Sequence, residues 1–239
     1  MFSGFSPLST QDIRKLSAYK EKTLGSVGVT RDGRVYRYSL VGGTALAPGK
    51  LNVAATVDTN VSNVAVAAAA AIGDKKVVLD AGGAITADAY QDGTLNVNDA
   101  TGEGISYSVG GNTATSEAAE LTATLNEPVE VALVADTSEV TLTKNPWGGV
   151  VVSVADQADM PVGVSNITAT AAYYAWIQTR GVCAVLADET IAVGSAVVCG
   201  SSTVGAVETM DTDDVVAQVG IALVAGVDTE YREVYLTID

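Results

Sequence analysis

Few residues in this chain are of the types that carry out chemistry, and their spacing matches no common catalytic motif. The 239 residues include no histidine, which excludes Ser-His-Asp and Cys-His catalysis and removes the commonest metal ligand. Cys183 and Cys199 stand in apolar runs without a CxxC spacing, so we interpret them as buried core residues. A disulfide or a catalytic thiol is the less favoured alternative. Gly102 and Gly104 lack the Lys-Ser/Thr of a phosphate-binding loop and indicate turns.

Two acidic stretches are the remaining candidates for ion binding. Asp211, Asp213 and Asp214 would offer the carboxylate oxygens that hard cations prefer, but they lack the spacing and the central glycine of a calcium loop. The stretch from Asp92 to Asp99 alternates like one strand of a hairpin. We therefore expect a solvated loop and a hairpin here, and a protein that is not an enzyme and binds no metal or cofactor.

Three aromatic residues are candidates for protein contacts. Trp147 lies beside flexible backbone at Gly148, where a tryptophan either anchors an interface or packs a loop onto the core. Tyr174 and Trp176 alternate in a strand and therefore share one face, which belongs either to the core or to an interface. Trp147, Tyr174 and Trp176 are our hypothesis for contacts between subunits.

The charge of the chain is unevenly distributed. The net charge is −15, but residues 1–50 hold eight basic and three acidic groups, a net charge of +5, against −20 for the other 189 residues. A basic segment on an acidic body predicts that the N-terminal part docks on an acidic partner, the alternative being chance clustering on a solvated face. The candidate docking residues are Arg14, Lys15, Arg31, Arg34 and Arg37.

The overall charge also limits the class of partner. A strongly acidic chain argues against nucleic acid as the main partner. The longest nearly apolar stretches, Val64–Ile72 and Val215–Val227, are too short to span a bilayer, so no membrane is expected. Residues 1–10 do not read as a secretory signal, and we expect the chain to be made in a cytosol.

The pattern of the chain predicts a mainly β fold. Residues 9–22 are the best helix candidate, because Ser9 and Asp12 have capping-box spacing and Ile13 shares a face with Leu16. From there to the end, turn residues recur every eight to twelve positions between short Val/Thr/Tyr/Leu runs, which is typical of β-sandwiches and barrels.

The individual strands are legible from these runs. Residues 27–38 read as a hairpin around an Arg-Asp-Gly turn, and residues 64–72 form an alanine-rich stretch that fits either a short helix or a buried strand. The other expected strands are 76–80, 95–97, 105–109, 121–125, 129–133, 140–143, 174–179, 182–186, 196–199, 216–223 and 233–238.

We divide the chain into three segments. A basic, extended N-terminal arm with a short helix and a hairpin covers residues 1–50, and a central β domain covers 51–152. A connector with several acidic residues and turns, among them Asp156 and Asp159, leads to a C-terminal barrel-like unit at 166–239. Whether the β-rich body forms one unit or two is left open.

Several segments resemble the capsid decoration (cement) proteins of tailed phages. The resemblance is carried by Leu24–Tyr38 with Gly42–Leu51, by Tyr90–Tyr107, and by Trp176–Gly194 with Val219–Leu223. It is spread over most of the chain and no single segment is a sharp signature.

The resemblance implies a non-catalytic virion protein on the outer capsid surface. Such proteins commonly sit as homotrimers and clamp the major capsid protein. Three alternatives remain, namely another virion part such as a head fibre, tail or adaptor subunit, a carbohydrate-binding β adhesin, or a carboxylate-based glycosidase. The last would require two converging acids with different pKa values, and the sequence singles out no such pair.

Overall fold

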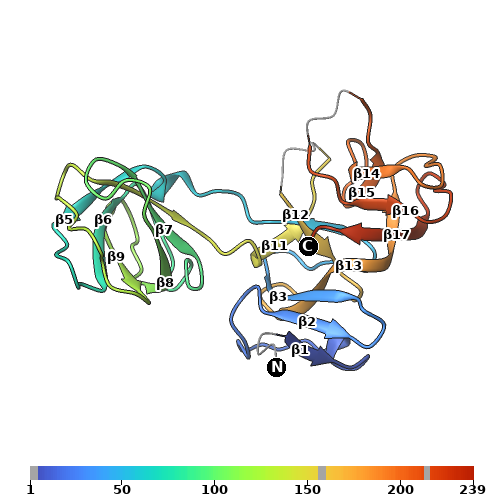
Figure 1. Ribbon diagram of the computed structural model, residues 1–239, viewed down its shortest axis with the longest axis horizontal. Coiled ribbons are helices and arrows are strands. Elements are labelled where there is room, and N and C mark those ends of the chain that lie inside the picture. Colours follow the sequence, from blue (N-terminus) through green and yellow to red (C-terminus); the bar gives the residue numbers. More distant parts are fainter. Residues whose placement is uncertain (1–4, 156–159, 213–215) are drawn as a thin grey trace. The chain divides into compact units, whose positions relative to one another are not determined.

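The computed structural model describes residues 5–155, 160–212 and 216–239, and it confirms the expectation of a mainly β protein with barrel-like sheets (Figure 1). The chain folds into two compact units. Unit 1 consists of residues 1–55 and 146–239, and unit 2 consists of residues 56–145. Unit 2 is therefore an insertion within the sequence of unit 1.

Unit 1 contains an 11-stranded sheet, together with the short 3-10 turn η1 (Asp12–Arg14). Its strands are β1 (Phe5–Leu8), β2 (Val27–Thr30), β3 (Val35–Val41), β4 (Leu51–Val53), β11 (Gly148–Val152), β12 (Pro161–Val164), β13 (Tyr174–Ala187), β14 (Ala196–Cys199), β15 (Ala206–Thr209), β16 (Gly220–Ala222) and β17 (Tyr231–Thr237).

The long strand β13 organises unit 1. Its first half pairs with β3 and β12, and its second half pairs with β17 and β15. Strands β11 and β4 connect β3 to β12, while β14 and β16 connect β15 to β17. The pairings thus close two small rings of strands that share β13, and β2 and β1 extend the sheet beyond β3.

Each part of unit 1 has its own apolar cluster. The ring of β13–β17 encloses a cluster in which valine is the commonest residue. Both cysteines are buried, as the sequence predicted, and they form no disulfide with each other. The ring of β3, β4, β11 and β12 encloses a second cluster around Ile177. A third cluster is aromatic and packs Tyr36, Tyr38 and Trp176 beneath Leu8 and Ile13. Residues 5–50 are therefore built into unit 1, with β1, β2 and β3 as strands of its sheet, and they do not extend away from it as an arm.

A buried polar network supports β13 where its partners change. The Gln178 side chain is fully buried, and its Nε2 donates to the carbonyl oxygens of Arg180 and Val182 at 3.1 and 2.9 Å. Its Oε1 accepts from Asn166 Nδ2 at 2.8 Å and from the Tyr36 hydroxyl at 3.2 Å. Burial raises the pKa of Tyr36 to about 12, so this hydroxyl remains a donor at ordinary pH. The network satisfies backbone groups at the register shift between Gln178 and Arg180.

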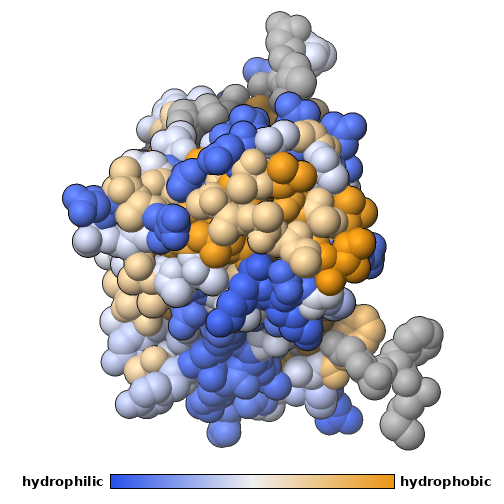
Figure 2. Space-filling model, turned by 90° about the vertical axis from the view of Figure 1, so that its left-hand side faces the viewer, coloured by the Kyte–Doolittle hydropathy of each residue, from blue (hydrophilic) through white to orange (hydrophobic). Residues whose placement is uncertain are grey.

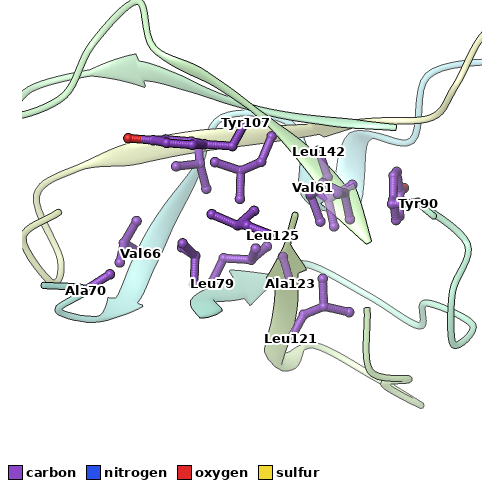
Figure 3. Packing of buried hydrophobic residues seen from close by; sticks show 14 of the residues in the cluster. Val61, Val66, Ala70, Leu79, Tyr90, Tyr107, Leu121, Ala123, Leu125 and Leu142 are labelled. Atoms are coloured by element: carbon purple, nitrogen blue, oxygen red, sulfur yellow. The ribbon is translucent and has the colours of Figure 1, made fainter. Parts of the chain in front are cut away.

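Unit 2 is a closed barrel of six strands in the order β10-β5-β6-β9-β8-β7. The strands are β5 (Val64–Ala68), β6 (Lys76–Ala81), β7 (Thr94–Asp99), β8 (Ser106–Asn112), β9 (Ala119–Leu125) and β10 (Glu139–Thr143), with the 3-10 turn η2 (Thr59–Val61) at the entry. Alternate side chains project inward, and Figure 3 shows Leu79 and Leu125 side by side in the core of the barrel. The alanine-rich stretch at residues 64–72 therefore begins with a strand, β5.

The expected helix at residues 9–22 is wrong, although its capping box forms. The Ser9 amide donates to Asp12 Oδ2 at 2.8 Å, and the Asp12 amide donates to Ser9 Oγ at 3.2 Å. The helical turn nevertheless ends at Arg14, because Ser17 exchanges both backbone hydrogen bonds with Tyr174 of β13. A helix of this length is marginal alone, and strand pairing replaces it.

Several expected strand boundaries also differ. The run 129–133 forms no strand, and within it only Leu133 makes an isolated bridge, to Ala70. The expected strand at 216–223 is reduced to β16, and the two strands expected at 174–186 are one continuous strand. The segment boundaries at residues 50, 152 and 166 do not coincide with those of the two units, because β3 and β4 pair with β11, β12 and β13, which follow unit 2 in the sequence.

Gly220 should be required by the close packing of β16 on β17. A Cβ at Gly220 would lie 2.3 Å from the Tyr235 carbonyl oxygen and 2.9 Å from Val234 Cγ1. We expect Gly220→Ala to lower the free energy of unfolding of unit 1 by about 1–3 kcal/mol. Gly43→Ala is the control, because a Cβ there meets no atom within 4 Å, and its effect should stay within about 0.5 kcal/mol. Equal denaturation midpoints for the two variants would contradict this packing.

Candidate protein-binding surface

Three adjoining hollows form a groove on unit 1, which we call the N-terminal groove. The first, of about 250 Å³, lies between Pro7 of β1 and the side chains of Lys15 and Lys22. The second, of about 340 Å³, lies between residues 8–10 and the β2–β3 turn. The third, of about 360 Å³, lies between that turn and β13 with β17. The second hollow shares Leu8 with the first, and Asp32 and Arg34 with the third, so the three hollows are neighbours.

The β2–β3 turn positions the charged side chains in the middle of the groove. Gly33 has a φ of 82°, a left-handed conformation that suits glycine and closes the predicted hairpin. The Asp32 carboxylate accepts from the Thr30 hydroxyl and from Arg34 Nε, the latter at 2.8 Å. These bonds lower the pKa of Asp32, with the Thr30 bond as the largest cause. Asp32 therefore remains ionised and fixes the turn.

The five cations predicted to dock have different environments. Arg14 and Arg31 are exposed and have no ion-pair partner among the described residues, and Arg31 lines the groove. Lys15 also lines it and is paired with Glu21 at 2.7 Å. Arg34 is held by Asp32 and donates through NH1 to the Tyr36 hydroxyl at 3.0 Å. Arg31, Arg34 and Lys15 are thus brought together along one groove.

Arg37 lies apart from the groove and is engaged within unit 1. Its Nε and NH2 donate to the two carboxylate oxygens of Asp239 at 2.5 and 2.6 Å, and its NH1 donates to the Gly25 carbonyl oxygen at 2.8 Å. Its guanidinium also lies 4.8 Å from the centre of the Trp147 ring. This side chain therefore joins three segments of unit 1 and has little capacity left for a partner protein.

The predicted aromatic interface is largely internal. Trp176 is 6% exposed and makes an edge contact with Tyr38, on which Tyr174 stacks at a centroid distance of 5.6 Å. Trp147 is half-buried, and its Nε1 donates to the Val162 carbonyl oxygen at 3.2 Å. The chain itself covers most of these rings, which leaves them little area for contact with another subunit.

An exposed apolar row, not anticipated from the sequence, borders the groove. Val182 of β13 lies directly opposite Tyr235 of β17, which lies opposite Ile221 of β16. Their side chains are 46%, 37% and 40% exposed, and Val182 and Tyr235 also line the third hollow. The sequence contained one indication of this row, because β17 has apolar side chains on both of its faces. Val234 and Leu236 on one face point into the core, which leaves Tyr235 on the other.

The residues considered for chemistry have structural environments. Burial raises the pKa of Cys183 to about 12, which keeps its thiol protonated. Asn96 accepts from Ser106, and Asn98 donates to Thr141, on the polar face of β7. Asp156, Asp159, Asp213 and Asp214 lie outside the described residues.

Neither a metal cluster nor a membrane helix occurs in the described part of the chain. Within it, no three Cys, Asp or Glu side chains are placed to hold a metal ion together. No helix within it has the length and apolar character needed to cross a membrane. Comparisons of the chain with protein-family models, curated proteins and solved structures found no match.

Replacing Arg37 should destabilise unit 1. We expect Arg37→Met to lower the free energy of unfolding by about 1–2 kcal/mol, a modest value because both partners of the pair remain 23% exposed. Arg31→Met is the control and should stay within about 0.5 kcal/mol of the parent. The measurement is chemical denaturation at pH 7, and a reversed order of the two variants would contradict the internal role of Arg37.

The effect of Arg37→Met should also depend on pH. Hydrogen bonds from Arg37 lower the pKa of Asp239 below its ordinary value of 3.8, against the opposing effect of desolvation. A carboxyl whose folded-state pKa is lowered contributes stability above its unfolded-state pKa and loses it as the pH falls through the folded-state value. The difference between Arg37→Met and the parent should therefore narrow below pH 3.8. A constant difference down to pH 2 would contradict the ion pair.

Proposed function

We propose that this chain is a structural virion protein of a tailed phage that binds the outer surface of the capsid and stabilises it. The observation that supports this proposal most is the N-terminal groove, where four cationic side chains lie near an exposed apolar row. The resemblance of several segments to capsid decoration proteins supplies the class of partner. The protein acts by binding and catalyses no reaction.

The chemistry of the groove suits an acidic protein surface. Arg31 and Lys22 line it without an ion-pair partner among the described residues, so each is available for a carboxylate of the partner. The adjacent row of Val182, Tyr235 and Ile221 offers apolar contact, and tyrosine and arginine are enriched where protein interfaces have their largest binding energies. The partner would be the major capsid protein.

The groove is also prepared for binding before the partner arrives. The turn that carries Arg31 is fixed by the bonds from Thr30 and Arg34 to Asp32, and β2 and β3 are paired within the sheet. Because these groups are already ordered, docking costs less conformational entropy than ordering an extended arm would. The proposed docking element is therefore an ordered surface of unit 1 and not an extended arm.

The edge strand β1 is a poor site for pairing with a strand of the capsid protein. Within the described residues, β1 pairs only with β2, so its other side is an edge. Pro7 lies in the middle of this edge and has no amide hydrogen to donate. Side-chain contacts at the groove, rather than strand addition, are thus the proposed mode of binding.

Charge reversal in the groove should weaken binding to capsids. The assay is co-sedimentation with heads that lack this protein, taken from the phage that encodes it. We expect Arg31→Glu or Lys22→Glu to reduce the affinity about tenfold, and binding of the parent to weaken when salt rises from about 50 to 500 mM. Lys144→Glu in unit 2 changes the net charge equally and should bind like the parent.

Two outcomes would contradict the proposal. One is that the parent fails to co-sediment with the heads at low salt, and the other is that all three variants bind equally. Quantitative mass spectrometry of purified virions then separates the possible positions. A copy number in proportion to the capsid protein supports capsid binding, whereas a fixed handful of copies assigns the chain to a tail, fibre or adaptor position.

A further inference from the structure

The loop at residues 15–22, between η1 and β2, carries the most exposed aromatic side chain of the described residues. Tyr19 is 82% exposed, against 59% for Phe5 and 47% for Tyr231. Its hydroxyl has no hydrogen-bond partner among the described residues, since its printed bonds are those of its backbone. The packing of unit 1 therefore does not account for an aromatic residue at this position.

The backbone that carries Tyr19 is nevertheless fixed. The Tyr19 amide donates to Ser17 Oγ at 3.2 Å, and the Ser17 hydroxyl donates to the Tyr19 carbonyl oxygen at 2.7 Å. Lys15 Nζ donates to both carboxylate oxygens of Glu21, at 2.7 and 2.9 Å, which closes the loop on either side of Tyr19. The Glu21 amide donates to the Tyr38 hydroxyl at 3.0 Å. Tyr19 thus projects from an ordered loop, and a partner that covers its ring would have few other groups to order.

Two leucines, and not Tyr19, attach this loop to the apolar clusters of unit 1. Leu24 is 9% exposed and belongs to the aromatic cluster, and Leu16 packs half-buried against the cluster around Ile177. Tyr19 belongs to neither cluster. Its replacement should therefore leave the fold of unit 1 unchanged, as is usual for an exposed side chain without partners.

The surroundings of Tyr19 are basic. Residues 14–22 hold four basic groups and one acid, a net charge of +3, and the acid, Glu21, is paired with Lys15. Lys15 and Lys22 also line the first hollow of the N-terminal groove. The loop therefore forms one side of this groove, and its charge suits the same acidic surface.

Unit 2 is less suited to an acidic partner. It has exposed aliphatic side chains, among them Ile72, Val131 and Val134, and Figure 2, a view onto unit 2, shows apolar side chains gathered in one area bordered by hydrophilic ones. Residues 56–145 hold thirteen acidic groups and three lysines, however, a net charge of −10. An acidic surface would be repelled there, so the charges favour unit 1 as the part that meets the capsid.

We propose that Tyr19 is the anchor of the contact with the major capsid protein, and that its ring fills an apolar depression whose rim carries carboxylates. This inference rests on the proposed function and names the side chain that determines its affinity. The ring supplies apolar contact area at the centre, and its hydroxyl donates to a rim carboxylate, since a tyrosine hydroxyl usually finds a partner when it is buried. The cations of the groove then orient the two surfaces.

The decisive variant removes the ring without changing charge. In co-sedimentation with heads that lack this protein, Tyr19→Ala should bind about tenfold more weakly than the parent, or weaker still, with an unchanged thermal midpoint. Tyr19→Phe keeps the ring and should stay within about threefold of the parent. The matched control is Tyr173→Ala, an exposed tyrosine of unit 1 at 38%, which should bind like the parent.

Two further measurements separate an anchor from a general effect on the groove. Tyr19→Ala changes no charge, so its affinity should fall with salt as steeply as that of the parent, whereas Arg31→Glu should show a shallower dependence. Hydroxyl-radical footprinting of the parent should show Tyr19 protected on heads, with Tyr173 labelled equally in the free and the bound protein.

The possible failures can be told apart. A parent that does not bind heads at low salt overturns the proposed function and the anchor together. A parent that binds, combined with equal binding of Tyr19→Ala or with an unprotected Tyr19 ring, overturns the anchor alone. The anchor is also overturned if Tyr19→Ala lowers the thermal midpoint, which would make the ring a support of the fold. Self-association of the parent that Tyr19→Ala abolishes would assign the ring to a contact between copies instead.

Discussion

Unit 1 depends on the pairing of β13 with different partners along its two halves. Its first half pairs with β3 and β12 and its second with β17 and β15, so one strand closes two rings. Where the neighbouring strands of β13 change, its backbone groups need other hydrogen-bond partners. The fully buried Gln178 side chain supplies two such hydrogen bonds. Gly181, with a φ of 89°, adopts the left-handed conformation required next to it. The positions of both the N-terminal groove and the apolar row follow from this strand, because β3 and β17 are its neighbours.

The sequence was most informative where the determining interactions are local. The hairpin at residues 27–38 depends on a turn closed by Gly33, and the alternation in β6 and β9 depends on adjacent side chains. The capping box of Ser9 and Asp12 also formed as expected, yet the helix did not, because the Ser17 bridge to Tyr174 joins residues far apart in the sequence. The division into two units could not be derived for the same reason, since β4 and β11 pair across the ninety residues of unit 2.

The candidate surfaces were predictable to a smaller extent. The basic character of residues 1–50 identified the part of the chain that forms most of the groove, but composition could not distinguish Arg37, which is engaged with Asp239, from the exposed Arg31. The aromatic residues that suggested an interface pack mainly against each other, since an aromatic ring buries more area inside the unit than valine or alanine does. Exposed apolar surface came instead from branched residues such as Val182 and Ile221, whose outward direction depends on strand register.

The two units differ in charge. Unit 2 has a net charge of −10, whereas Lys15, Lys22, Arg31 and Arg34 of unit 1 line the N-terminal groove. A contact between opposite charges weakens as salt rises, so docking through the groove would depend on ionic strength. The acidic charge of unit 2 would in turn repel other copies of the chain in solution, which leaves the groove available for an acidic partner.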